Sequence, residues 1–234
     1  MRRWPAVLFA LCFPTAMAWL YFVVFAADAD AQPNRLMQLL YAAGKVVQFG
    51  FPLLWLLGDR AALRDLSLKP RGVGLGLAFG VVVALGFFAV FELLLRSGML
   101  DGLAGRLRAK VAQLGLASPG GFLLLAGFLA LLHSGMEEWY WRGFVHGQLS
   151  HLLPQRSAIA VSSLGFMAHH VVILAVYLPG RFWTVVVPLS LCIAVGGAFW
   201  AWLHVRSRSL LGPWISHALV DAALMAAGYR VLFA

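Results

Sequence analysis

Charged residues are scarce in this sequence, and acidic residues are the scarcest of all. Only 12% of the 234 residues are charged, 62% are hydrophobic, and Asp and Glu together number nine. A soluble domain carries charge on about a quarter of its residues and is closer to half apolar. The composition therefore excludes an ordinary soluble domain and predicts an all-α, polytopic membrane helix bundle.

Cysteine is also rare, which removes two further classes of protein. Cys12 and Cys192 lie far apart in apolar runs, and two such residues make neither a disulfide framework nor a zinc knuckle. No His-Glu-x-x-His motif is present either. The net charge of +9 suits loops beside anionic lipid better than a nucleic-acid surface. We therefore expect the lipid bilayer as a partner and no nucleic acid.

What the sequence has in quantity is long apolar runs. They predict about seven membrane-spanning helices in a single domain, residues 1–234, without an internal repeat. Arg2 and Arg3 before the first run are typical of a signal peptide, but the run continues to Phe25, so we expect an uncleaved first helix. The predicted spans are residues 5–27, 37–57, 72–95, 121–143, 157–178, 182–205 and 211–233.

Residues 98–116 differ from these spans in their pattern. Apolar residues recur there at helical spacing, and Arg106, Arg108 and Lys110 lie among them. This pattern predicts one amphipathic helix lying in the membrane interface. Such a helix is either an ordinary connector or a gate for a substrate.

Two adjacent carboxylates interrupt the fourth predicted span. Glu137 and Glu138 are followed by Arg142 at the end of an apolar run. A charge at the middle of a bilayer costs about 2.5–3.5 kcal/mol on insertion scales, so such residues are kept for pairing or for chemistry. Glu138 and Arg142 are one helical turn apart, which predicts an ion pair between them. This pair leaves Glu137 unexplained, and Glu137 is therefore the first candidate for a catalytic residue.

Two later spans carry histidines. His169 and His170 lie deep in the fifth predicted span, and because successive helical positions differ by about 100°, only one of them faces the bundle centre squarely. His217 and Asp221 share a face of the last predicted span. An Asp in that position can hold the tautomer and orientation of an imidazole.

Other polar residues have less certain partners. His133 lies one turn before Glu137 and shares its face, so it could bond that carboxylate. Lys45 in the second predicted span could pair with one of the buried acids. We expect His146 and His151, which follow the fourth predicted span, in a polar loop.

In order and spacing, these residues resemble the motifs of the CAAX-processing and bacteriocin-processing (CPBP) family of intramembrane proteases, relatives of the Ras-converting CAAX endopeptidase. The family pattern is a Glu-Glu-x-x-x-Arg run, then Phe-x-x-x-His, then a His-x-x-x-Asn/Asp ending. The resemblance covers residues 121–225, and each motif lies on its own predicted span. The matching residues are Glu137-Glu138 to Arg142, Phe166 to His170, and His217 to Asp221.

The sequence departs from the family pattern in two places. The family carries a phenylalanine and then two glycines, four residues apart, before the last motif. Gly197 matches the first glycine, whereas Ala194 and Ala201 replace the phenylalanine and the second glycine. Small residues allow helices to approach closely, and Ala201 nearly preserves that property. The larger departure is Asp221, where the best-known members carry asparagine.

The resemblance implies an endopeptidase that acts on a membrane protein or peptide. Glu137 and His170 would activate a water for attack on a peptide carbonyl, and His217 with Asp221 would stabilise the developing oxyanion. An ionised Asp221 would repel that oxyanion, so Asp221 must be protonated or must bond His217. Because no His-Glu-x-x-His motif occurs, spacing gives zinc no support, and we favour a mechanism without a cofactor.

The supporting residues and one alternative complete this hypothesis. Glu138 and Arg142 would form a structural pair that orients the motif. In a zinc-dependent version, Glu137, His170 and His217 would supply three ligands and leave one position for water.

Two other functions fit the composition less well. A non-catalytic membrane scaffold or partner-binding protein with the same fold would keep Glu138 and Arg142 but would not need His170 or His217 inside the bundle. A proton-coupled transporter would be expected to show paired halves with broken helices, which the spans do not show. The Ala-, Leu-, Gly- and Arg-rich composition favours the cytoplasmic membrane of a bacterium. The sequence identifies neither a physiological substrate nor a prenyl pocket.

Overall fold

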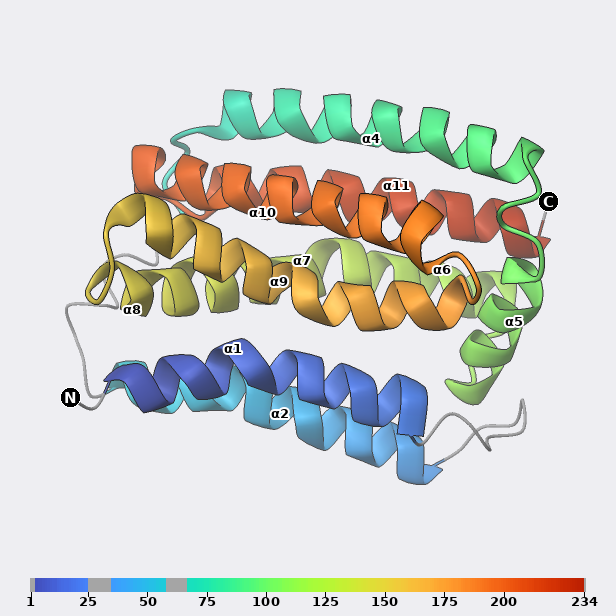
Figure 1. Ribbon diagram of the computed structural model, residues 1–234, viewed down its shortest axis with the longest axis horizontal. Coiled ribbons are helices and arrows are strands. Elements are labelled where there is room, and N and C mark those ends of the chain that lie inside the picture. The colour runs from blue at the N-terminus through green and yellow to red at the C-terminus, as the bar shows by residue number, and fades with distance from the viewer. Residues whose placement is uncertain (1–2, 25–34, 58–66, 234) are drawn as a thin grey trace.

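The computed structural model describes residues 3–24, 35–57 and 67–233, and these residues form helices with no strand among them (Figure 1). The expected all-α helix bundle is therefore confirmed. The long helices are α1 (Arg3–Trp19), α2 (Arg35–Leu57), α4 (Val73–Arg96), α9 (Gln155–Tyr177), α10 (Val187–Ser207) and α11 (Leu211–Phe233). The π-helical segments η1 (Leu20–Val24) and η4 (Phe182–Val186) extend α1 and precede α10.

The observed spans follow the predicted ones closely. Six of the described helices are long and apolar enough to cross a membrane, and α11, the predicted seventh, has the predicted bounds. The first span is helical from Arg3 to Val24, and residues 25–27 of the prediction lie outside the described residues. The largest difference is the fourth span, which continues over Pro119–Ser150 instead of ending near residue 143.

This longer fourth helix corrects the expectation for one histidine. His146 is buried inside the helix, with its Nε2 atom 2.8 Å from Nε2 of Gln155, and does not lie in a polar loop. His151 does follow the helix, in an exposed turn. The apolar run becomes more polar after residue 143, but packing against neighbouring helices keeps the last turns buried.

The long helices run side by side along the longest axis of the molecule (Figure 1). In this view α4 covers one side, α10 and α11 lie beneath it, α9 and the fourth span come next, and α1 and α2 cover the opposite side. The fourth span is thus central in the bundle. This position places its carboxylates among side chains from several other helices.

Close approach between α4 and α11 depends on glycine. A Cβ atom built on Gly76 would lie 2.2 Å from the carbonyl oxygen of Gly212, and one built on Gly80 would lie 3.0 Å from Ser216. With Gly72, these residues repeat every four positions along α4. Such a stripe of small residues is a common way for membrane helices to bring their backbones together. It holds α11, and with it His217, against the bundle.

The predicted amphipathic helix is α5 (Leu103–Gln113), which lies at one end of the bundle in Figure 1. Its arginines bond the last turns of two long helices. Arg106 Nε donates to the carbonyl of Tyr177 at 2.7 Å, and Arg108 Nη2 donates to that of Leu232 at 3.2 Å. Helix C-termini leave carbonyls without helical partners, so these contacts satisfy groups that would otherwise be unbonded. Burial lowers the pKa of Lys110, on the same helix, to about 8.

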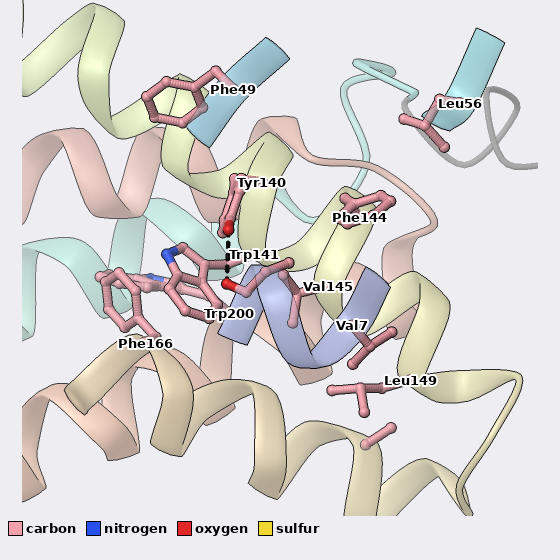
Figure 2. Packing of buried hydrophobic residues seen from close by; sticks show 12 residues of the cluster. Val7, Phe49, Leu56, Tyr140, Trp141, Phe144, Val145, Leu149, Phe166 and Trp200 are labelled. Atoms are coloured by element: carbon pink, nitrogen blue, oxygen red, sulfur yellow. Dashed lines mark hydrogen bonds between the residues drawn. The ribbon is translucent and has the colours of Figure 1, made fainter. Parts of the chain in front are cut away.

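A cluster of aromatic and aliphatic side chains packs the fourth span against its neighbours (Figure 2). Tyr140, Trp141, Phe166 and Trp200 are all almost fully buried. The hydroxyl of Tyr140 donates to the carbonyl of Ala10 on α1 at 2.7 Å, which is the dashed line in Figure 2. The cluster fixes the rotation of the fourth helix about its own axis.

The glycine stripe predicts the effect of one substitution. Gly76→Val would place side-chain atoms on the Gly212 backbone, which cannot move away as a flexible side chain could. Overpacking of this kind costs typically about 1–3 kcal/mol, and a backbone neighbour favours the upper end. We expect a clearly lower unfolding temperature in detergent. Gly74→Val, on the same helix with no atom within 4 Å of its Cβ position, is the matched control and should unfold like the wild type.

Candidate active site

The carboxylates of the fourth span lie between two distortions of the helix. The helix comprises α6 (Pro119–Gly127), the π-helical η2 (Phe128–His133), α7 (Ser134–Glu138), the π-helical η3 (Trp139–His146) and α8 (Gly147–Ser150). Short π-helical segments inside α-helices are frequent at functional sites. The indole of Trp214 on α11 donates to the carbonyl of Leu131 within η2 at 2.9 Å. The distorted segment is therefore bonded to the helix that carries His217.

Glu138 and Arg142 form the predicted ion pair. Arg142 Nη1 donates to Glu138 Oε1 at 2.9 Å, and both side chains are almost fully buried. Arg142 Nη2 also donates to the carbonyl of Gly197 on α10 at 3.1 Å. The guanidinium lies over the rings of Phe166 and Trp200, 4.7 and 5.1 Å from their centroids. These contacts satisfy a charge that would otherwise be costly inside the bundle.

Gly197 is the glycine that matched the family pattern, and the structure gives its physical reason. A Cβ atom at this position would lie 3.2 Å from Phe166 and 3.3 Å from Arg142 Nη2. Both separations are tighter than ordinary van der Waals contacts. The absence of a side chain lets the arginine reach the backbone of α10.

His217 bonds Glu138, a contact that the sequence did not predict. Its Nδ1 atom is 2.8 Å from Glu138 Oε1 and must donate, because a carboxylate oxygen only accepts. The imidazole stacks on Trp200 with 4.3 Å between ring centroids, and the Trp200 indole donates to Ser216 Oγ at 2.9 Å. The orientation of His217 is therefore fixed by Glu138 and Trp200.

Asp221 contacts the other nitrogen of the same ring. His217 Nε2 lies 3.6 Å from Asp221 Oδ1 and 3.7 Å from Glu137 Oε2. The predicted shared face of His217 and Asp221 is thus observed. Glu138, however, makes the shorter contact to this histidine.

Glu137 is surrounded by imidazoles. It is 4% exposed, and its carboxylate oxygens lie 3.9 Å from His133 Nε2, 3.7 Å from His169 Nε2 and 3.7 Å from His217 Nε2. These separations exceed a direct hydrogen bond. They leave the carboxylate oxygens without a direct bond to these nitrogens, so Glu137 can accept from a water beside it. Glu137, which the Glu138–Arg142 pair left unexplained, therefore faces three imidazole nitrogens, one each from the fourth span, α9 and α11.

His169, to which the sequence gave no role, lies near Glu137, with 3.7 Å between its Nε2 atom and Glu137 Oε1. The family resemblance implies a role for His170, whose Nδ1 lies 2.9 Å from the Phe166 carbonyl and must donate to it. The neutral His170 ring therefore carries its lone pair on Nε2. The two histidine rings are adjacent, with centroids 4.0 Å apart. The rotation of about 100° between successive helical positions indicated that one histidine of the pair would face inward, but it could not select which one.

Lys45 joins the site through His133. Its ammonium lies 3.1 Å from His133 Nε2 and 3.2 Å from Gln48 Oε1. An ammonium only donates, so His133 Nε2 accepts and this ring is neutral. Lys45 thus reaches Glu137 through an imidazole instead of pairing with an acid directly.

The zinc alternative has little geometric support. Among the described residues, no three His, Cys, Asp or Glu side chains are arranged so that they could hold a metal ion. In particular, the proposed ligands Glu137, His170 and His217 do not form such a group. We therefore derive no step through a metal.

The buried ion pair predicts the effect of removing its cation. Arg142→Met leaves the Glu138 charge buried with only His217 to bond it, and breaking a buried pair in this way costs about 3–5 kcal/mol. The double variant Glu138→Gln, Arg142→Met carries no buried charge at this position and should recover much of that loss. Denaturant unfolding of both proteins in detergent measures the difference. Wild-type stability in Arg142→Met would contradict the assignment.

Comparison with known proteins gives one family match for the part of the chain that carries the site. Residues 119–223 match the family model described as Type II CAAX prenyl endopeptidase Rce1-like. None of the curated proteins and none of the solved structures matches the chain. The matched residues contain both carboxylates, the histidine pair and the His217-to-Asp221 motif, and the family together with six apolar helices makes this an integral, multi-pass membrane protein. Over residues 119–223, the chain is therefore similar to the Rce1-like type II CAAX prenyl endopeptidases.

Proposed function

We propose that this protein is an intramembrane endopeptidase that hydrolyses a peptide bond in a membrane-associated protein or peptide, using a water activated by Glu137 and histidine. One observation carries the proposal. Glu137 is a buried carboxylate that forms no ion pair with a Lys or Arg of the described residues, and three imidazole nitrogens surround it at 3.7–3.9 Å. A buried carboxylate that faces titratable imidazoles instead of a fixed lysine or arginine charge favours a chemical role over a structural one.

Glu137 would act as the general base. Its oxygens accept a proton from a water beside the carboxylate, and the resulting hydroxide attacks the peptide carbonyl carbon. Glu137 then returns that proton to the leaving nitrogen as the C–N bond breaks, which releases an amine and a carboxylic acid. His170 would assist through Nε2, the acceptor that its bond to Phe166 leaves available. His169, at 3.7 Å from Glu137, is the second candidate for this assisting role.

His217 would stabilise the oxyanion that forms on the carbonyl. Glu138 accepts its Nδ1 proton and holds the ring, so Nε2 points toward Glu137 and Asp221. A proton on Nε2 would be donated to the developing negative charge. Asp221 would then help to keep that proton in place without being the group that orients the ring.

The metal-dependent version makes a different prediction for chelators. In the metal-free mechanism, removal of divalent metal leaves cleavage unchanged. Loss of cleavage with a chelator, restored by stoichiometric zinc, would contradict it and favour ligation by Glu137 and histidines.

Two rival functions differ from the proposal in what they require. A scaffold would use Glu138 and Arg142 for folding, but gains nothing from a buried Glu137 beside three histidines. A transporter would use Glu137 in a proton relay, and proton-coupled flux that is lost in Glu137→Gln would support it. The family match and the arrangement around Glu137 favour the protease.

The proposal predicts that cleavage in membranes depends on Glu137. Protein termini in membranes expressing the wild type should include new termini that are missing with Glu137→Gln, because the amide cannot accept the proton of water. Glu92→Gln is the matched control, since Glu92 is a span carboxylate that pairs with Arg230 away from the site. Identical termini for wild type and Glu137→Gln, at equal abundance of folded protein, would move the assignment toward a scaffold.

Asp221 offers a second prediction. Because Glu138 already orients His217, Asp221→Asn should keep cleavage within about tenfold of wild type, the range of one modest hydrogen-bond change. Initial cleavage rates of Asp221→Asn and of the wild type should be compared on a substrate identified from the new termini. A loss of several hundredfold or more would assign the orienting role to Asp221 instead.

A further inference from the structure

A basic pocket lies at the end of the bundle where α4 begins and α10 ends, opposite α5 in Figure 1. Its volume is about 540 Å³. Arg71, Arg206 and Arg208 supply its charges, and Leu75 and Leu203 supply an apolar wall. We call it the arginine pocket. None of the residues placed in the candidate active site lines it.

The three arginines carry charge that the described residues do not compensate. None of the guanidinium groups of Arg71, Arg206 and Arg208 forms a hydrogen bond or an ion pair with another described residue. Arg106 and Arg108 of α5, by contrast, donate to carbonyls at the ends of two long helices. Like charges gathered in one pocket repel each other unless an anion lies among them. The arginine pocket therefore favours an anionic ligand.

The backbone around the pocket is held by contacts between the segment before α4 and the turn between α10 and α11. Ser209 Oγ donates to the carbonyl of Lys69 at 2.6 Å. The backbone N–H of Leu210 donates to the carbonyl of Ser67 at 2.8 Å. The arginines are exposed side chains, but they extend from a fixed backbone. The pocket thus exists before a ligand arrives.

The first turn of α4 adds backbone donors to these charges. Gly72, which lines the pocket, is the N-cap residue of α4, and no side chain caps this helix. The first N–H groups of a helix have no helical acceptor, and they favour an anion beside them. A Cβ atom built on Gly72 would lie 3.0 Å from Cβ of Ser207, so this turn packs against the end of α10.

Trp202 indicates the depth of the pocket in the membrane. Its ring is exposed on α10, and the Arg206 guanidinium lies over it, 5.6 Å from the centroid. Exposed tryptophans are enriched where spans meet the headgroup region. The spans Val73–Arg96 and Phe182–Ser207 also begin and end at this level. Leu75 is exposed one turn farther along α4, where an acyl chain can lie against it.

We propose that the arginine pocket binds the phosphate of an anionic phospholipid, with an acyl chain along Leu75. A guanidinium donates to phosphate oxygens through two parallel N–H groups, which makes arginine well suited to this anion. Three arginines exceed the charge of one phosphodiester, so cardiolipin, with two phosphates, binds more tightly than phosphatidylglycerol. Phosphatidylcholine binds weakly, because its choline group adds a cation to a pocket that already holds three.

The test measures lipid binding to the full chain in a neutral detergent by native mass spectrometry. The probes are phosphatidylcholine, phosphatidylglycerol and cardiolipin. We expect the wild type to bind phosphatidylglycerol about tenfold more tightly than phosphatidylcholine, and cardiolipin more tightly still. A triple variant, Arg71→Gln with Arg206→Gln and Arg208→Gln, should bind all three lipids about equally. It should fold, because the three side chains are exposed.

A second triple variant is the matched control. Arg35→Gln with Arg96→Gln and Arg181→Gln removes the same charge from exposed positions outside the pocket, and it should keep the wild-type preference. A ligand of the folded state raises the unfolding temperature, so cardiolipin should stabilise the wild type and this control but not the pocket variant. An equal loss of preference in both variants, an unchanged preference in the pocket variant, or no preference in the wild type would overturn the inference.

A soluble phosphate distinguishes a lipid site from a general phosphate site. Glycerol phosphate carries the headgroup anion without an acyl chain, so it lacks the apolar contacts with Leu75 and Leu203. At millimolar concentration it should leave the unfolding temperature of the wild type unchanged. A rise equal to that given by phosphatidylglycerol would reject the lipid and assign the pocket to soluble phosphates. None of these measurements uses cleavage, so the inference does not depend on the proposed function.

Discussion

A single side-chain oxygen, Oε1 of Glu138, links three helices at the centre of the bundle. It accepts from Arg142 at 2.9 Å and from His217 at 2.8 Å, and Arg142 continues to the backbone of Gly197. The fourth span, α10 and α11 therefore meet at a single buried carboxylate. Because breaking a buried ion pair leaves an uncompensated charge, this network constrains how the three helices can be rotated and spaced.

The network leaves Glu137 available for a different task. The two adjacent carboxylates differ by about 100° around the helix, so one points to Arg142 and the other toward the imidazoles. Glu138 makes direct bonds, whereas Glu137 lies beyond hydrogen-bond distance of its three nitrogen neighbours. A rigid group held by two direct bonds, next to a less constrained one, is an arrangement that holds a catalytic residue in place.

Sequence spacing predicted the contacts that lie within one helix and missed those between helices. The Glu138–Arg142 pair and the shared face of His217 and Asp221 followed from the helical repeat, and the structure confirms both. The Glu138–His217 bond and the approach of Lys45 to His133 did not, because they depend on how each helix is rotated against its neighbours. The same rotation places His169 nearer to Glu137. Neither π-helical segment of the fourth span has a signal that the apolar pattern could have revealed.

Our central claim is that Glu137 acts in catalysis as the general base, whereas Glu138 stabilises the fold through its buried bonds. The most direct measurement compares Glu137→Gln with Glu138→Gln for thermal unfolding and for cleavage of one identified substrate, in the same nanodiscs. We expect that Glu137→Gln unfolds at or above the wild-type temperature and does not cleave, whereas Glu138→Gln unfolds at a clearly lower temperature. A strongly destabilised Glu137→Gln that still cleaves, or a Glu138→Gln that is as stable as wild type, would contradict it.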